Sequence, residues 1–256
     1  MRYVIQLSYD GTAYGGWQIQ PNAVTVQEVL QAGIKRATGQ EIIVTASGRT
    51  DAGVHAYGQI CHFDADWRIP PERIADCINS FLPDDIKIVA SGRASEDFDS
   101  NRSAKKKTYA YHAYLSSRIQ PLKERYSARI KGKPLHVGLM QKAAETLCGE
   151  HDFKAFCASG SQVKTTVRTL YAVEVTEGFS LGCTDYTVRV TGNGFLYNMV
   201  RTIAGTVFAI GAGQRSLQDL QTALAEADRD KLGKTMPAKG LILESVDYGF
   251  PLFPNG

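Results

Sequence analysis

The chain has 256 residues, of which 43% are hydrophobic and 21% charged, and its formal net charge is +3. This composition is ordinary for a globular protein, and no apolar run approaches the roughly 20 residues that a membrane-spanning helix needs. The N-terminal stretch turns polar after seven residues, so we expect a first strand there rather than a secretory signal. The length suits one large α/β domain or two halves of roughly 120–130 residues each.

The first half of the chain alternates between strand and helix patterns. Apolar or alternating runs bounded by glycine, proline or aspartate predict strands, and apolar residues at a helical period predict helices. We expect, in chain order, a strand at 2–11 ending in an Asp-Gly turn, a helix at 24–40, strands at 41–48 and 53–66, a helix at 70–83, and strands at 84–94 and 107–117.

The clearest single element is the helix at 24–40. Thr25 and Glu28 form a capping-box pair at its start, and Gly39 is a natural stop. Its apolar residues recur at helical spacing: Val26, Val29, Leu30, Ile34 and Ala37.

The second half repeats this order of elements. We expect a helix at 137–153, a hairpin of strands at 166–178 and 184–195, helices at 196–213 and 217–228, and a closing strand at 240–250. The sequence thus predicts an α+β protein of two similar α/β halves with mixed, largely antiparallel sheets. We set the halves at 1–115 and 116–256, treat 121–136 as the connection, and expect a ligand in a central cleft.

Positive charge is concentrated in one segment, residues 102–133. It carries ten Lys or Arg and one acidic residue, Glu124, a net charge of +9, so the remainder of a +3 chain carries −6. Such a segment indicates local attraction to a polyanion, although a solvated strand and loop with surface lysines would look the same.

Cysteine and histidine spacing does not favour a metal site or a disulfide framework. The cysteines are odd in number and form no C-x-x-C: Cys61, Cys77, Cys148, Cys157 and Cys183. We expect reduced thiols, as in a cytosolic protein. His55 and His62 are seven apart on a predicted strand, so they face opposite sides and do not form a ligand pair.

Nucleotide-binding and acyl-transfer motifs are absent from the sequence. There is no Walker A run and no G-x-S-x-G, and "GNGFLY" and "GAGQRS" lack the third glycine of a dinucleotide fingerprint. We therefore expect no cofactor and no metal.

One short stretch, "GRTDAG" at 48–53, combines a tight turn with a cation and a carboxylate. Gly48 and Gly53 allow backbone conformations that other residues avoid. Asp51 has a short side chain, and an aspartate with an unperturbed pKa of about 3.9 is ionised at neutral pH and can act as a nucleophile or base. Arg49 could pair with it or bind a phosphate. A plain turn, in which aspartate beside glycine is common, is the alternative.

Several motifs together resemble the TruA family of tRNA pseudouridine synthases, and the resemblance spans essentially the whole chain. The residues that carry it are, in order, "YDGTAYGGWQIQP", "TVQEVLQAGI", "GRTDAGVHAYGQ", "SAKKKTYAY", "HDFKAF", "TVRTLY", "NGFLYNMVRTIAG" and "AKGLILESVDY". The resemblance implies the pseudouridine synthase fold, with no cofactor.

The resemblance also implies roles for individual residues. Asp51 would be the catalytic nucleophile, Arg201 would pair with it and orient it, and Tyr109 would contact the target uracil. Arg49 would help to extrude the nucleotide. Three lysines would contact phosphates: Lys105, Lys106 and Lys107.

Each of these residues also has an ordinary structural interpretation. Tyr109 alternates with Tyr111 on a predicted strand and could be a core aromatic. Arg201 lies off the apolar stripe of its helix, which suits a solvated arginine as well as one aimed into a cleft. One position departs from the family pattern: Asn101 stands where an arginine is common, with Arg102 beside it.

The resemblance implies tRNA as the substrate, with uridines at positions 38, 39 and 40 of the anticodon stem-loop, and it implies a homodimer. A cytoplasmic location is expected from the reduced cysteines. Two other functions remain open on the residues alone. A non-catalytic RNA-binding protein would explain the basic segment but not Asp51, and a small-molecule hydrolase would explain Asp51 but not the basic segment.

Overall fold

The structure is a computed structural model that describes residues 1–67, 69–158 and 163–253. The chain groups into two compact units. Unit 1 comprises Met1–Lys107 and Leu243–Gly256, and unit 2 comprises Thr108–Ile242. The domain boundary expected after residue 115 stays a prediction. The compact units divide after Lys107, and the end of the chain returns to unit 1.

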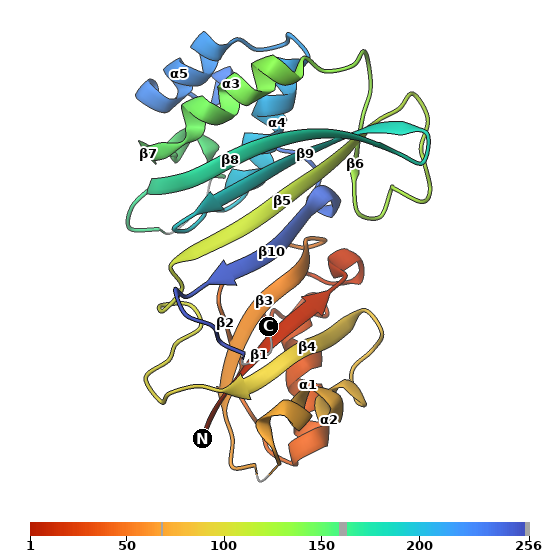
Figure 1. The fold of residues 1–256 in the computed structure, drawn as a ribbon, viewed down its shortest axis with the longest axis vertical. Coiled ribbons are helices and arrows are strands. Elements are labelled where there is room, and N and C mark those ends of the chain that lie inside the picture. Colours follow the sequence, from red (N-terminus) through yellow and green to blue (C-terminus); the bar gives the residue numbers. More distant parts are fainter. Residues whose placement is uncertain (68, 159–162, 254–256) are drawn as a thin grey trace. The chain divides into compact units, whose positions relative to one another are not determined.

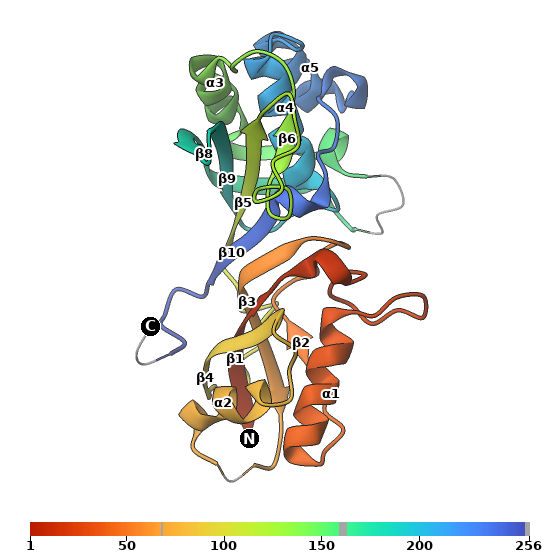
Figure 2. The same ribbon diagram turned by 90° about the vertical axis from the view of Figure 1, so that its right-hand side faces the viewer.

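Unit 1 is built on a sheet in the order β4-β1-β3-β10, with the short β2 on β3. The strands are β1 (Arg2–Tyr9), β2 (Thr45–Ala46), β3 (His55–Asp64), β4 (Ile86–Arg93) and β10 (Leu241–Asp247), the last reaching unit 1 at Leu243. Strand β1 pairs antiparallel with both β3 and β4. Helices α1 (Val26–Thr38) and α2 (Ile74–Asn79) pack on this sheet and against each other (Figures 1 and 2).

The predicted ends of helix α1 are confirmed. Thr25 lies at the N-cap, where its hydroxyl accepts a hydrogen bond from the Glu28 amide at 3.4 Å. Gly39 ends the helix with φ of 75°, a left-handed conformation that glycine adopts without a steric penalty. The apolar face is buried in the core of unit 1 through Val26, Leu30 and Ile34.

Unit 2 is built on strands in the order β5-β9-β8-β7, which continue the strand order of the same sheet, with β6 parallel to β5. The strands are β5 (Lys106–Leu115), β6 (Ala128–Ile130), β7 (Gly149–Asp152), β8 (Val167–Ser180) and β9 (Cys183–Gly192). Three helices cover one side of it (Figure 2): α3 (Val137–Leu147), α4 (Met199–Gly211) and α5 (Leu217–Glu226). The prediction of an α+β fold with mixed, largely antiparallel sheets is confirmed.

The predicted hairpin is also present, and its turn explains its register. Ser180 pairs with Cys183, so the loop contains only Leu181 and Gly182. Both have positive φ, 48° and 73°. This combination is the two-residue turn whose twist matches that of antiparallel strands.

The strand predicted at 41–48 is wrong in length, because only Thr45–Ala46 pairs with β3. Side chains of helix α1 form hydrogen bonds with the backbone of Val44, just before β2. Gln31 Oε1 accepts from the Val44 amide at 2.9 Å, and Gln27 Nε2 donates to the Val44 carbonyl at 2.9 Å. A backbone that is satisfied in this way does not need a partner strand.

Two predicted helices are shorter than expected. The segment at 70–83 contains a 3₁₀ turn, Pro71–Arg73, and then α2 of six residues. In the segment at 137–153, α3 ends at Leu147, and Gly149 has φ of 105°, which a helix cannot accommodate. The chain turns there and enters β7, which pairs with β8.

The segment at 121–136, expected to be a connection between halves, belongs to unit 2. Its residues Ala128–Ile130 form β6, in register with Ala113–Leu115 of β5. Parallel pairing joins residues that are distant in sequence, so the local pattern does not reveal it.

Candidate active site

The stretch at 48–53 forms a loop between β2 and β3 of unit 1, and backbone hydrogen bonds hold both sides of it. The Trp17 amide donates to the Thr50 carbonyl at 3.0 Å, and the Gly53 amide donates to the Tyr14 carbonyl at 3.4 Å. Within the loop, the Val54 amide donates to the Asp51 carbonyl at 3.1 Å. Asp51 is half-buried at the centre of this arrangement.

Close backbone packing makes a glycine necessary opposite the loop. Gly16 has φ of 95°, and a Cβ atom there would lie 2.7 Å from the Thr50 carbonyl oxygen and 3.1 Å from the Ala52 amide. Real Cβ atoms do not approach backbone that closely. The "YGGW" and "GRTDAG" motifs are therefore two sides of one structure, although about 35 residues separate them in sequence.

Buried side chains fix the entry to the loop. The Ser47 hydroxyl donates to Gln59 Oε1 at 2.5 Å, and Gln59 Nε2 donates to the Gly48 carbonyl at 2.7 Å. Further along, the hydroxyls of Tyr9 and Thr50 share a buried hydrogen bond of 2.7 Å. Gln59 had no predicted role. Its position four residues into the next strand was the only sequence signal.

The three lysines at 105–107 differ in their surroundings. Lys105 and Lys106 are exposed, whereas Lys107 is half-buried. The Lys107 ammonium donates to the Ser47 carbonyl and, at 3.3 Å, to Asn101 Oδ1. Burial lowers the pKa of Lys107. The structure thus places Lys107 against the first residues of the loop, while its predicted contact with RNA stays a prediction.

Asn101, the residue that departs from the family pattern, takes part in this arrangement as an acceptor for Lys107. Arg102 is exposed, and its amide donates to Asp99 Oδ1 at 2.9 Å. Asn101 therefore helps to hold the lysine that supports the loop, which is a role its amide oxygen can perform and an arginine cannot.

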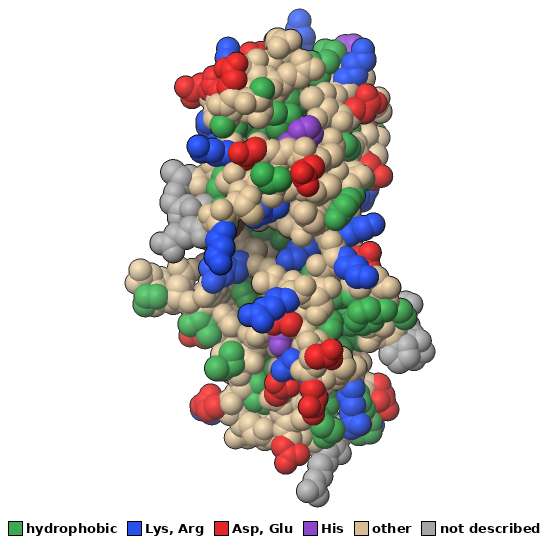
Figure 3. Space-filling view, turned by 90° about the vertical axis from the view of Figure 1, so that its left-hand side faces the viewer, with side chains coloured by type: hydrophobic (Ala, Val, Ile, Leu, Met, Phe, Trp, Pro, Cys, Tyr) green, Lys and Arg blue, Asp and Glu red, His purple; other side chains and the backbone are tan. Residues whose placement is uncertain are grey.

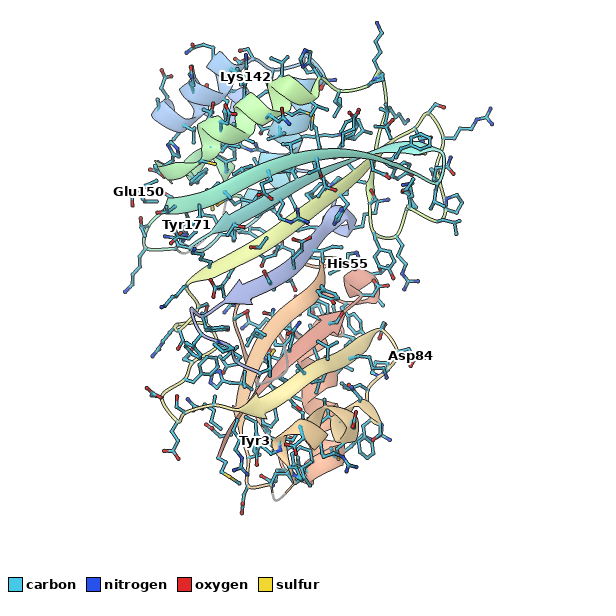
Figure 4. The ribbon with its side chains drawn as sticks, viewed as in Figure 1. Tyr3, His55, Asp84, Lys142, Glu150 and Tyr171 are labelled. Atoms are coloured by element: carbon cyan, nitrogen blue, oxygen red, sulfur yellow. The ribbon has the colours of Figure 1, made fainter. Side chains whose placement is uncertain are left out.

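His55 begins β3 immediately after the loop (Figure 4) and is 3% exposed. The Gly11 amide donates to its Nδ1 at 3.0 Å, and Asp10 Oδ1 lies 3.1 Å from the same nitrogen. This histidine ties the end of the loop to the turn after β1. It is buried in unit 1, as is His62, whose Nδ1 lies 2.9 Å from the Ser100 hydroxyl.

Arg201 lies in the first turn of α4 in unit 2, half-buried rather than fully solvated. Its Nε donates to the Met236 carbonyl at 2.7 Å, and its Nη1 donates to Asn198 Oδ1 at 2.6 Å. Asn198 precedes the helix with φ of 64°. Two acceptors therefore orient the guanidinium plane, which distinguishes Arg201 from a flexible surface arginine.

Tyr109 lies on β5 and is 8% exposed. Its ring stands edge-on to Phe195, with ring centroids 5.2 Å apart and an interplanar angle of 85°. Tyr111, two residues on, is fully buried, its hydroxyl donates to the Pro237 carbonyl at 2.7 Å, and burial raises its pKa. Phe195 belongs to the "NGF" motif, so two of the predicted motifs meet at Tyr109.

Arg49 is exposed. It makes no hydrogen bond or ion pair with another residue in the described ranges 1–67, 69–158 and 163–253. Its guanidinium is therefore available to a ligand, unlike that of Arg201.

The predicted site residues fall into two groups. Asp51, Arg49 and the lysines at 105–107 belong to unit 1, where Lys107 contacts the start of the loop, and Tyr109 and Arg201 lie in unit 2. The pairing of Asp51 with Arg201 stays a prediction. Figure 3 shows Lys and Arg side chains at the surface of both units, interspersed with Asp and Glu.

The cysteines are free thiols, with Cys61 and Cys183 buried. Within the described part of the chain, no group of three His, Cys, Asp or Glu residues is arranged to hold a metal ion. No helix among the described residues is long and apolar enough to cross a membrane.

Comparison with known proteins identifies the family. A sequence model described as tRNA pseudouridine synthase matches residues 6–109 and 143–249. The chain is 45% identical over 244 residues to tRNA pseudouridine synthase A of Ruminiclostridium cellulolyticum, covering 95% of this chain and 98% of that protein. It is 42% identical over 257 residues to tRNA pseudouridine synthase A of Shouchella clausii, covering 99% and 96%.

Among solved structures, a Cbf5-Nop10-Gar1 complex aligns with a TM-score of 0.38 at 13% identity, covering 94% of this chain and 49% of that chain. That likeness is weak, whereas the sequence matches include the loop around Asp51, the strand of Tyr109 and the helix of Arg201. The resemblance read from the motifs is confirmed: the chain belongs to the tRNA pseudouridine synthase family, and it is an enzyme of the isomerase class.

Proposed function

We propose that the protein converts uridine to pseudouridine at positions 38, 39 and 40 of the tRNA anticodon stem-loop, with Asp51 as the catalytic nucleophile. The construction of the loop around Asp51 carries this proposal. Backbone bonds from Trp17 and Gly53 hold the loop on either side, and Lys107 and Gln59 bind the carbonyls at its entry. A short carboxylate side chain on a fixed backbone loses little freedom on reaching a reactive position.

The reaction is an isomerisation, so its balance needs no external reagent. The bond between uracil N1 and ribose C1′ breaks, the base turns, and C5 bonds to the same C1′. The proton that C5 loses is replaced on the ring by one at N1. Asp51 either bonds to C1′, adds to the base, or acts as a base toward a glycal, and each route returns a free carboxylate.

The other residues position the RNA. A uridine inside a stem must first be flipped out, which costs a few kcal/mol. In this proposal Arg49, which is exposed, enters the space that the base leaves, and Tyr109 receives the uracil. In the same proposal Arg201, oriented by Met236 and Asn198, pairs with Asp51. Lys105 and Lys106 bind phosphates.

The test is a tritium-release assay on unmodified tRNA whose uridines carry tritium at C5. Wild type should release tritium, because C5 loses its hydrogen when it bonds to C1′. Asp51→Asn removes the charge but nearly keeps the shape, and it should bind tRNA while releasing at least roughly 10³-fold less. Release by both proteins would remove Asp51 from its role.

Retained tRNA binding without any release by wild type would instead favour a non-catalytic RNA-binding protein. tRNA variants with a single uridine at 38, 39 or 40 test the positions separately. The homodimer and the cytoplasmic location stay predictions, and light scattering of the purified protein, alone and with tRNA, tests the first.

A further inference from the structure

Unit 2 contains a cavity of about 590 Å³ that the proposed catalytic residues do not line. It lies beside the C-terminal part of α4, with β6 on one side and the segment at 229–236 on the other. Its lining includes the apolar side chains of Phe208 and Leu232. Four cations line it: Arg129, Lys131, Arg215 and Lys234.

One wall of the cavity is held against α4 by backbone packing. A Cβ atom on Gly205 would lie 1.8 Å from the Lys234 carbonyl oxygen, and one on Gly233 would lie 2.3 Å from the Gly205 carbonyl oxygen. Both positions therefore require glycine. The Thr206 hydroxyl accepts from the Gly233 amide at 3.0 Å, which ties the same two segments together.

Arg229 stiffens this wall further. Its Nη1 donates to the Gly233 carbonyl at 3.0 Å and its Nη2 to the Thr235 hydroxyl at 2.9 Å. Thr235 also shares a hydrogen bond of 3.1 Å with Thr202 of α4. The backbone that carries Lys234 is thus fixed, while its side chain is exposed.

The cations retain donors for a ligand. Lys131 and Lys234 are exposed and make no side-chain hydrogen bond or ion pair within the described part of the chain. Arg129 donates once, from Nη1 to the Ser117 carbonyl at 3.2 Å. Arg215 donates from Nε to the Leu232 carbonyl at 3.2 Å and from Nη2 to the Asp230 carbonyl at 2.9 Å.

No carboxylate is among the described residues that line the cavity. The described lining thus holds four positive charges and no carboxylate. Glu124 and Asp219 lie close enough to Arg129 and Arg215 to interact with them, whereas Lys131 and Lys234 make no ion pair within the described part of the chain. Cations grouped in this way attract an anion with several charges. A single free phosphate could not neutralise them. A nucleic-acid backbone supplies consecutive phosphates, and its sugars can lie against the apolar side chains.

We propose that this cavity binds consecutive backbone phosphates of RNA, as a second contact separate from the residues that act on the uridine. The inference rests on the proposed function for its source of RNA. Arg129 and Lys131 lie between the two blocks matched by the family model, 6–109 and 143–249, so the family match does not account for them.

The first experiment measures the salt dependence of tRNA binding. Lys131→Gln/Lys234→Gln removes two exposed charges and leaves the glycine-packed wall intact. Each lost phosphate contact lowers the slope of log K against log salt by about 0.7–0.9, so the slope should fall by about 1.4–1.8. The matched control is Lys142→Gln/Lys154→Gln, two exposed lysines of unit 2 that do not line the cavity (Lys142 is labelled in Figure 4). Its slope should equal that of wild type.

The second experiment locates the contact by amine acetylation and mass spectrometry. Bound tRNA should protect Lys131 and Lys234 but not Lys142, and millimolar inorganic phosphate should protect none of them. Equal protection by phosphate alone would replace the proposal with a small-anion site. An unchanged slope together with unprotected lysines would overturn it.

Failure of this inference is distinguishable from failure of the proposed function. Tritium release by wild type with an unchanged slope in the double variant would keep the enzyme and remove the second contact. No release by wild type with a reduced slope in the variant would keep the RNA contact and remove the catalytic proposal.

Discussion

The loop at 48–53 in unit 1 and the segment at 229–236 in unit 2, which begins with a 3₁₀ turn at Arg229–Lys231, both lie against neighbouring backbone at positions where glycine is required. Gly16 serves the loop, and Gly205 with Gly233 serves the segment. The two regions differ in how they use charge. In the loop a lysine ammonium binds a backbone carbonyl, and in the segment a threonine hydroxyl and Arg229 hold the backbone.

The two regions therefore expose different charged side chains to a ligand. Lys107 is engaged by Ser47 and Asn101, so the loop presents one carboxylate, Asp51, beside the exposed Arg49. The segment in unit 2 presents Lys234 on a fixed backbone. The number of lysines in a region therefore does not predict how many are available to phosphate, because some donate to the protein's own carbonyls.

The largest expected effect comes from Gly205→Ala, which disrupts the packing of the segment at 229–236 against α4. Its new Cβ would meet the Lys234 carbonyl at 1.8 Å, so α4 and the segment must separate. We expect the free energy of unfolding to fall by about 3 kcal/mol, measured in urea. Gly178→Ala is the control, since nothing lies within 4 Å of its added Cβ, and its change should stay within about 0.5 kcal/mol. Equal effects from the two variants would mean that the segment is not seated on α4 as described.

An intermediate effect is expected from Lys107→Met, which tests whether this lysine positions the loop or binds RNA. Without the ammonium the Ser47 carbonyl loses its donor and the loop shifts. Turnover at saturating tRNA should fall by roughly 10- to 100-fold, because small displacements of a catalytic group have effects of that size. The slope of binding against salt should not change.

Lys105→Met is the matched comparison for this prediction. Lys105 is exposed, so its loss should lower the salt slope by about 0.7–0.9 and affect turnover at saturation less than Lys107→Met does. If the two variants showed the opposite results, Lys107 would be the phosphate contact, and the inference that it positions the loop would be wrong.

The smallest effect concerns Glu124, the only acidic residue of the basic segment at 102–133. Hydrogen bonds from Lys239 and from the Tyr114 hydroxyl hold its pKa below the usual range. A carboxylate whose pKa is lower in the folded state stabilises the fold above the unfolded value of about 4.3, and that stability is lost as the pH falls through the folded value.

Glu124→Gln should therefore lower the free energy of unfolding by about 1 kcal/mol at pH 7 and by much less below pH 4. Urea unfolding at both pH values measures this. Glu150→Gln, an exposed carboxylate on β7 (Figure 4), is the control and should show little change at either pH. A difference that persists at low pH would mean that the glutamate acts through packing rather than charge.

Much of the fold could be predicted because its signals are local. Helix α1 with its caps and the β8–β9 hairpin follow from residues within a few positions of one another. Three of the errors share a different cause. β7 pairs with β8, β6 pairs with β5, and the chain before β2 is satisfied by side chains of α1, so each outcome depended on a partner distant in sequence.

The sequence by itself determined the family, because several motifs occur along the chain in one order, and it singled out Asp51 of "GRTDAG" as the candidate nucleophile. Only the tertiary structure decided that Lys107 and Asn101 support that loop while Lys105 stays exposed, and that four cations from separate segments share one cavity. The reason is physical. Charge and motif belong to the chain, whereas the partner that satisfies each charge is set by packing between segments far apart along it.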